Sequence, residues 1–429
     1  MKLFRATVGG SDRFRRNLKR FAAANVIAQL IGVSSLPILT RIYSPAEFGV
    51  LTAFTMVQSV CLAVSTLRFD WMIPNARSPR QADRLSAAGL FAAISVSVLL
   101  LGAVVSIHGR LEGWELASSS PVILMSLPLG VFTGSVILLL QARNVRMGDL
   151  SPISRAKLVQ AVATLLLGIA FGLLGFQQSG LVAAYVCGFG LALVVMTKDL
   201  RAVVLSVAST TMRELARVTR AYGRQLASSV GLSLVNITMT SSPILLLMFF
   251  YDAVVVGWYG LIFRIATAPI GFVTTALVQS FWTDAADLVR RDPRALLRFY
   301  LGTVRRLAII AVPFGAICML APSYLPPILG EEDWSGAGLL LVAITPYLVG
   351  MIVFSPTTHL VVYRKAHWQL LIDAATLVAC CAVFGLLATL DCEAWVALLA
   401  ASVVMFIGYL ARFYAHLHAN RKLCERIGV

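Results

Sequence analysis

Twelve apolar runs, each close to the length of a membrane-spanning helix, dominate the sequence and restrict what it can fold into. A bilayer core about 30 Å thick is crossed by about 20 residues of α-helix. Inside lipid, only helices and closed barrels satisfy their backbone hydrogen bonds. The sequence therefore predicts an all-α polytopic membrane protein with about 12 transmembrane helices. The runs cover approximately residues 21–40, 47–67, 85–106, 117–140, 158–176, 180–196, 226–250, 254–279, 307–322, 337–355, 368–390 and 394–411.

The composition agrees with a membrane protein, because 59% of the 429 residues are hydrophobic and only 13% are charged. Soluble domains are about 45–50% apolar and about 25% charged. The formal net charge of +16 raises the alternative of a nucleic-acid partner. The basic residues, however, lie in short gaps between apolar runs rather than on one soluble face, so we expect no nucleic acid.

The distribution of basic residues predicts the orientation. With 12 spans, 33 of the 36 Lys and Arg residues fall on the side that carries both termini, and Arg41 and Arg110 fall on the other. The positive-inside rule then places both termini in the cytoplasm. The first apolar run follows a basic start, but it has 20 residues and ends in "LPILTR" without a small-x-small cleavage site, so we interpret it as a retained helix.

The predicted outer loops leave no room for a catalytic domain, since the longest, 323–336, has 14 residues. No phosphate-binding Gly-Lys-Ser/Thr loop occurs, the five histidines are scattered, and the seven cysteines have no metal-ligand spacing. We therefore expect a protein that is not an enzyme and needs no metal or cofactor. The two longest inner segments, 197–225 and 280–306, contain basic amphipathic stretches, most simply helices on an anionic leaflet.

A faint internal repeat divides the chain into two halves. "SSLPILTRIYSPAEFGVL" compares with "TSSPILLLMFFYDAVVVGWY" and aligns span one with span seven. So short a match also arises by chance, but the long basic segment lies between spans six and seven. The expected domains are an N-terminal lobe (1–196), a cytoplasmic linker (197–225) and a C-terminal lobe (226–429), two six-helix lobes around a central cavity. The matched residues are Ser35, Pro37, Ile38, Leu39 and Gly49 with Ser241, Pro243, Ile244, Leu245 and Gly257.

One arginine, Arg264, stands within the eighth apolar run. A charge at the bilayer centre costs at least about 2.5–3.5 kcal/mol, so it requires a partner or a wet cavity. Arg264 shares a helical face with Gly257, Gly260, Thr267 and Gly271, which predicts that it faces protein. A structural salt bridge and a fixed cation lining a central cavity both fit, and we favour the cation.

Asp373 is the other charge well inside a span. It either neutralises Arg264 or binds a coupling proton or cation. Polar stripes also mark span one, with Asn25 and Gln29, and span seven, with Asn236. Such stripes line a hydrophilic lumen or hydrogen-bond neighbouring helices.

Three further charges lie at span ends. Arg68 and Asp70 follow span two in "LRFDWMIP", where positive-inside charge is an adequate explanation. The functional alternative is a substrate contact at Arg68 and a coupling or charge-partner role for Asp70. Arg41, at the outer end of span one, is less easily dismissed because basic residues are rare on that side.

Two stretches resemble a known family. "LPILTRIYSPAEFGVLTAF" with "LRFDWMIPNARSPRQADRL", and "GWYGLIFRIATAPIGFVTTALVQSFWTDAADLVRR", are similar to segments of Wzx-type O-antigen and polysaccharide flippases. These belong to the multidrug/oligosaccharidyl-lipid/polysaccharide exporter (MOP) superfamily. Twelve spans favour the O-antigen or capsule branch over the related peptidoglycan-precursor flippases, which usually have fourteen.

The resemblance implies a bacterial inner-membrane transporter that moves undecaprenyl-pyrophosphate-linked oligosaccharides from the inner to the outer leaflet by alternating access. It implies anion-holding lumen residues at Arg264, with Arg41 and Arg68 at weaker positions. Coupling to H⁺ or Na⁺ and contacts with other glycan-assembly proteins remain open. The alternatives are a cation-coupled drug exporter of the same superfamily and a membrane enzyme of glycan assembly.

Overall fold

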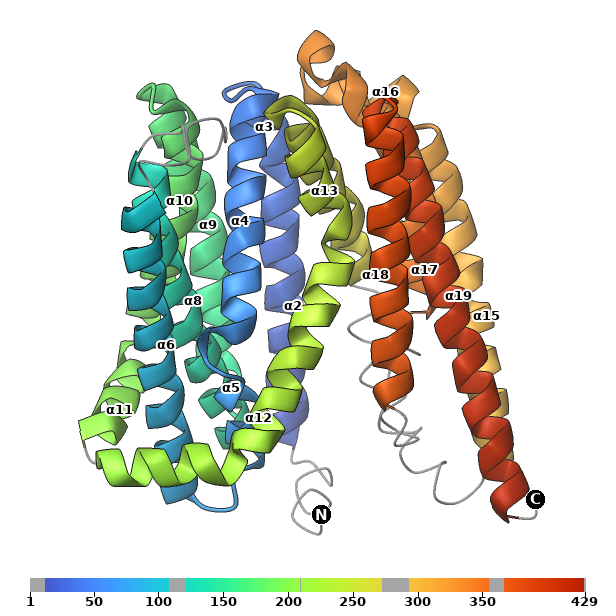
Figure 1. Cartoon of the computed structure of the whole chain (residues 1–429). Coiled ribbons are helices and arrows are strands. Elements are labelled where there is room, and N and C mark those ends of the chain that lie inside the picture. Colours follow the sequence, from blue (N-terminus) through green and yellow to red (C-terminus); the bar gives the residue numbers. More distant parts are fainter. Residues whose placement is uncertain (1–11, 108–120, 209, 272–292, 355–365, 428–429) are drawn as a thin grey trace. The chain divides into compact units, whose positions relative to one another are not determined.

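The computed structural model describes residues 12–107, 121–208, 210–271, 293–354 and 366–427, and in these ranges every regular element is a helix (Figure 1). Eleven helices are long and apolar enough to cross a membrane, or up to 12 if one bent pair counts as a single span. This confirms the predicted all-α polytopic fold. Arg110 and residues 280–292 of the second basic segment lie outside the described ranges.

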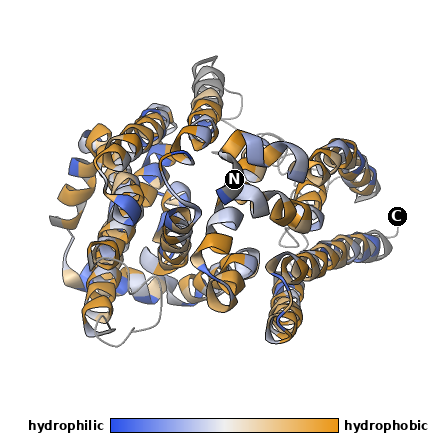
Figure 2. Cartoon of the chain, turned by 90° about the horizontal axis from the view of Figure 1, so that it is seen from above, coloured by the Kyte–Doolittle hydropathy of each residue, from blue (hydrophilic) through white to orange (hydrophobic). Residues whose placement is uncertain are grey.

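Large apolar side chains remain on the surface of these helices, as a lipid-facing protein requires. Leu99 is 72% exposed, Leu173 is 76% exposed and Val312 is 69% exposed. Hydrophobic residues colour most of the ribbon (Figure 2). A soluble protein rarely exposes so many large apolar side chains, so these surfaces are suited to contact with hydrocarbon.

Contacts divide the chain into two compact units. Unit 1 comprises residues 1–43 and 54–234, and unit 2 comprises residues 44–53 and 235–429. Helices α4 and α12 contribute to both. The helices of the first half are α2 (Asp12–Ser34), α3 (Leu36–Leu39), α4 (Pro45–Ser65), α5 (Phe69–Met72), η1 (Ile73–Asn75), α6 (Pro79–Ile107), α8 (Pro121–Met147), α9 (Ser151–Leu173), α10 (Gln177–Val195), α11 (Thr197–Ala208) and α12 (Met212–Thr240).

The second half begins with a short helix that follows α12 after a bend of 60°. Its elements are α13 (Ser242–Phe250), the helical span Ala253–Gly271, α15 (Pro293–Met319), α16 (Ala321–Leu329), η2 (Glu331–Trp334), α17 (Ser335–Phe354), α18 (Ala366–Thr389) and α19 (Ala394–Ile427).

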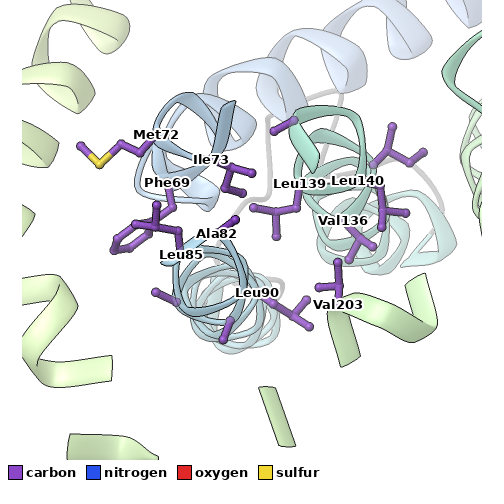
Figure 3. Packing of buried hydrophobic residues seen from close by; sticks show 14 of the residues in the cluster. Phe69, Met72, Ile73, Ala82, Leu85, Leu90, Val136, Leu139, Leu140 and Val203 are labelled. Carbon is purple, nitrogen blue, oxygen red and sulfur yellow. The ribbon is translucent and has the colours of Figure 1, made fainter. Parts of the chain in front are cut away.

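A hydrophobic cluster in unit 1 joins the segment 197–225 to the ends of the neighbouring spans. Val203 of α11 is buried in it with Phe69 and Leu139 (Figure 3). Leu215 and Leu226 of α12 are also buried in this cluster. Hydrogen bonding and an ion pair fasten the same segment, since Gln81 donates to the Tyr222 hydroxyl at 2.5 Å and Arg84 pairs with Glu214 at 2.6 Å.

The structure adds a protein contact to the interpretation of this segment. Part of its apolar face packs against protein, because α5, α6 and α8 offer apolar side chains for it to cover. Val204, Leu205 and Met212 stay exposed, and their contact with the leaflet stays a prediction. The basic face of the segment stays exposed at Arg213, Arg217, Arg220 and Arg224.

The faint sequence repeat has a structural counterpart in two helix interruptions. The first is between α2 and α3, where Ser35 is the N-cap and Pro37 lies in the first turn of α3. The second is between α12 and α13, where Ser241 is the N-cap and Pro243 follows; this bend is 60°. Proline removes a backbone donor and clashes with the preceding turn, so both helices end just before it. The aligned Ser and Pro residues thus interrupt the first helix of each half at matching positions.

Two glycines bring α4 and the span Ala253–Gly271 into backbone contact within unit 2. A Cβ on Gly49 would collide with the carbonyl oxygen of Ala253, and a Cβ on Gly257 would collide with that of Pro45. Ala253 lies four residues before Gly257, and Pro45 lies four residues before Gly49, so the contact is reciprocal. Gly260 likewise lies against the Thr52 side chain. Small residues allow this close approach between helices in a membrane.

Two helices extend further than their apolar runs. The ninth span was predicted over 307–322, but α15 begins at Pro293. The twelfth was predicted over 394–411, but α19 continues to Ile427. Hydropathy finds only the lipid-embedded part of a helix. Charged turns extend the helix beyond that part, and in α15 one such turn contains Arg305 and Arg306, both exposed.

The reciprocal glycine contact predicts the effect of adding a side chain at its centre. Gly257→Leu is expected to destabilise the protein by at least about 1–3 kcal/mol, because the new atoms meet backbone that cannot rotate away. Thermal unfolding in detergent, followed by size-exclusion chromatography, measures this. The matched control is Gly231→Leu, where a Cβ meets nothing within 4 Å. Equal stability of the two variants would show that α4 and the Ala253–Gly271 helix do not require this approach.

Candidate functional site

Arg264 lies half-buried on the helix Ala253–Gly271. It stands one turn after Gly260, on the face that Gly257 and Gly260 present to α4. Thr267, one turn further, donates from its hydroxyl to the Phe263 carbonyl at 2.6 Å. The small-residue stripe predicted from the sequence is thus a packing face, and Arg264 continues it.

Asp373 lies in α18, completely buried, and forms a salt bridge with Arg412 of α19, which is 3% exposed. The Arg412 guanidinium also donates to the Met239 sulfur at 3.0 Å. Asn236 lies on α12 and is exposed. The charge partner that the structure gives Asp373 is therefore Arg412, where the sequence analysis had considered Arg264.

A stack of aromatic rings leads from the Arg264 helix to this ion pair. Phe263 lies between Tyr259 and Tyr347, with ring centroids 5.6 and 6.3 Å away. Tyr347 stacks on Tyr409 at 6.2 Å, and Arg412 lies 5.2 Å from the Tyr409 centroid. The Tyr409 ring thus presents its polarisable, partly negative face to the buried arginine, which stabilises a cation in a dry site.

Tyr347 also contacts the broken span. Its hydroxyl donates to the carbonyl of Thr240, the last residue of α12, at 3.4 Å. The Ser242 hydroxyl donates to the Met239 carbonyl at 2.8 Å. A helix break frees backbone carbonyls, and in a membrane they need donors such as these.

In unit 1, the polar stripe of α2 faces a lysine. Lys157 of α9 donates to the Asn25 side-chain oxygen at 2.9 Å and lies 5.3 Å from the Phe21 ring centroid. Gln29, one turn after Asn25, has a shielded side-chain oxygen without a hydrogen-bond partner in the described part of the chain. Asn25 thus takes part in contact between helices, one of the two roles expected for this stripe.

Arg68 lies in a tight corner between α4 and α5, and Asp70 follows in the first turn of α5. Leu67 and Arg68 both have left-handed backbone conformations, with φ of 48° and 61°. Non-glycine residues held this way cost about 1–3 kcal/mol each and persist only where the surroundings impose them. Burial lowers the pKa of Arg68 and the nearby Asp70 carboxylate opposes that shift, so the guanidinium stays protonated.

Asp70 is buried and accepts a hydrogen bond from the Thr66 hydroxyl at 2.5 Å. It therefore serves this corner as an anchoring acid. Arg41, in contrast, is exposed after α3. The predicted site residues are thus distributed among separate places in the two units.

Sequence reasoning missed two charged residues of these places. Arg412 had been counted with the predicted inner tail, because hydropathy ends the twelfth span at residue 411. Its spacing from Tyr409 and His416 on one helical face was the available signal. Lys157 had likewise been counted with a loop, although it lies seven residues into α9. Among the described residues, no three His, Cys, Asp or Glu side chains gather as a metal site would require.

A family model described as polysaccharide biosynthesis protein matches residues 38–337, more than half of the chain. The chain belongs to this family. No curated protein sequence matches it.

The chain has a fold that solved transporters of the MOP superfamily share. A multidrug resistance MATE family transporter in an inward-facing conformation matches with a TM-score of 0.66 and 13% identity, over 94% of this chain and 98% of the other. The lipid II flippase MurJ in an inward closed conformation gives 0.69 and 11%, over 94% and 89%. A MOP transporter from Pyrococcus furiosus, described by the reversed polarity of its binding pocket, gives 0.60 and 14%, over 96% of both chains. The Wzx-type resemblance seen in the sequence is thereby supported in both family and fold.

The buried ion pair predicts a characteristic pattern of stability. Arg412→Ala leaves Asp373 buried without its countercharge and is expected to cost about 3–5 kcal/mol, whereas replacing the pair by apolar residues of similar size is close to neutral. We therefore expect Arg412→Met/Asp373→Leu to unfold at a higher temperature than Arg412→Ala. Thermal unfolding of the single and double variants measures the coupling. A double variant less stable than Arg412→Ala would contradict the pairing.

Proposed function

We propose that the protein is a flippase for undecaprenyl-pyrophosphate-linked oligosaccharides in O-antigen, capsule or exopolysaccharide assembly. It moves these units from the inner to the outer leaflet of the bacterial inner membrane by alternating access, with both termini in the cytoplasm. The observation that carries the proposal is the combination of a polysaccharide biosynthesis family with a transporter fold shared with a lipid flippase. Family alone is compatible with an enzyme, and fold alone with many cargoes.

In this proposal the protein is a transporter without catalysis or cofactor. A diphosphate lipid carries at least two negative charges, and a fixed cation lowers the cost of taking them out of water. We assign this role to Arg264, because it lies within a span and on a helix face that carries small residues. Arg68, Arg41, Asn25, Gln29 and Asn236 are proposed as further substrate contacts.

Asp373 has a different role in this proposal. Its carboxylate is already neutralised by Arg412 inside unit 2. A coupling proton or Na⁺ would have to compete with the Arg412 guanidinium for the carboxylate oxygen atoms of Asp373. We therefore assign the pair to stabilising unit 2. The membrane potential supplies an alternative drive, because an inside-negative potential favours each outward-moving negative charge by about 2.3 kcal/mol per 100 mV.

The nearest alternative is a cation-coupled drug exporter, since MATE transporters share the fold. A site for cationic drugs requires an acid with an available charge. In the described spans, the deeply buried Asp373 is bound to an arginine. A membrane enzyme of glycan assembly is a weaker alternative, because the family's match extends over a transporter fold.

The test is leaflet translocation in proteoliposomes of a labelled polyprenyl diphosphate bearing an oligosaccharide. Wild type is compared with Arg264→Ala, Arg264→Lys and the control Arg217→Ala, an exposed arginine on α12. We expect wild type and Arg217→Ala to be equally active. We expect Arg264→Ala to lose at least about tenfold in rate, equivalent to about 1.4 kcal/mol in the barrier, and Arg264→Lys to keep part of it.

The outcomes separate the claims. Full transport by a folded Arg264→Ala variant would make Arg264 structural while leaving the flippase function intact. No transport of the lipid by wild type, together with accumulation of a cationic dye in the same vesicles, would replace the flippase with the drug exporter. Intact unfolding temperatures in all variants are the control for folding.

A further inference from the structure

An exposed tryptophan lies beside Arg68 in the corner between α4 and α5. The Trp71 side chain is 56% exposed, and the Arg68 guanidinium lies 4.6 Å from its ring centroid. We propose that Arg68 and Trp71 form a docking site for the headgroup of the lipid-linked sugar, in which Arg68 binds the diphosphate and Trp71 carries the first sugar ring. This inference rests on the proposed function.

The corner is held in place by its buried neighbours. Phe69, Met72 and Ile73 lie in the hydrophobic cluster of unit 1, and Asp70 is tied to Thr66. The burial pattern leaves Trp71 exposed and Arg68 partly exposed on this turn, with Leu67, 38% exposed, beside them. Because the backbone is fixed, little conformational freedom is lost when a ligand binds, which favours affinity.

The backbone conformation of the corner is unusual and orients the Arg68 side chain. Leu67 and Arg68 are consecutive left-handed residues, and neither is a glycine. Strain of this kind is found at ligand-binding positions, where it fixes a side chain in a required direction. Here it ends α4 and turns the chain so that Arg68 covers one side of the Trp71 ring.

The donor set of the corner suits a phosphate. Arg68 is partly exposed. Its Nε atom is shielded from solvent and has no hydrogen-bond partner among the described residues, so an incoming phosphate is met by the terminal nitrogens of the guanidinium. Asp70 is nearby, but its oxygen is engaged by the Thr66 hydroxyl. A guanidinium presents its donors in a planar fork that matches phosphate oxygens.

The tryptophan suits the group attached to that phosphate. The indole is a wide apolar plane with a polar edge, so the C–H face of a sugar ring can lie on it. In the lipid-linked substrate the first sugar is bonded directly to the diphosphate, and the two binding elements are likewise adjacent. The ordinary alternative is a tryptophan that anchors the protein at the lipid headgroup level, which would not distinguish a sugar.

The test is equilibrium binding to the full-length protein in nanodiscs, with two probes. One is a polyprenyl diphosphate bearing a single hexose, and the other is the same lipid diphosphate without sugar. The variants are Trp71→Ala, Trp71→Phe and Arg68→Gln. The control is Trp395→Ala, a tryptophan that is 37% exposed on α19 and donates its indole N–H to Glu393.

We expect Trp71→Ala to weaken binding of the sugar-bearing probe about tenfold and to leave the bare diphosphate unchanged. Trp71→Phe should restore part of the loss, because it retains an aromatic face. Arg68→Gln should weaken both probes by a similar factor, and Trp395→Ala should affect neither.

Two results would overturn the inference while leaving the flippase function standing. One is wild-type affinity of Trp71→Ala for the sugar-bearing probe. The other is equal weakening of both probes by Trp71→Ala, the result expected of a lipid anchor. Failure of the wild type to bind either probe would overturn the docking site and the proposed function together.

Discussion

The absence of water from the hydrocarbon core is the constraint on which the rest of this structure depends. Every backbone polar group must find a partner within the protein, and every charge inside a span must be neutralised or lie in a wet place. Asp373 and Arg412 meet the second requirement by pairing within unit 2. The hydroxyl of Tyr347 meets the first at the break after Thr240. Arg264, the residue proposed to meet a substrate, is a further charge within a span.

The same constraint explains why the interruptions of the helices are informative. Breaking a helix inside a membrane leaves carbonyls that require donors, so a break persists only where the surroundings supply them. In transporters, proline-interrupted helices at matching positions of two halves indicate the functional region. Here Pro37 and Pro243 end the first helix of each half, and Gly49 and Gly257 then make the reciprocal close contact in unit 2. A repeat too short to be decisive in sequence is therefore reflected in the backbone.

Much of the fold could be predicted from the sequence because hydropathy and the length of a span are strong signals. The number and type of spans were predicted, and the family resemblance was carried by short motifs. Side-chain partners were not, since they depend on how helices rotate against one another. Arg412 was assigned to a tail because one charge ended the apolar run, although α19 continues beyond it. The amphipathic start of α12 was assigned to lipid, because a sequence cannot show whether Leu215 meets lipid or a neighbouring helix.

The central claim is that the protein moves an anionic lipid to the outer leaflet without coupling to a proton or Na⁺ gradient. The most direct test is to measure how the rate of translocation depends on the membrane potential. In proteoliposomes with equal pH and Na⁺ on both sides, a K⁺ diffusion potential is imposed with valinomycin, and movement of a lipid-linked diphosphate oligosaccharide is followed. Because each charge gains about 2.3 kcal/mol per 100 mV, we expect net outward movement at an inside-negative potential and none at zero potential with a pH or Na⁺ gradient alone. Movement that follows the ion gradient and ignores the potential would contradict the account and make a bound proton or Na⁺ the driving partner.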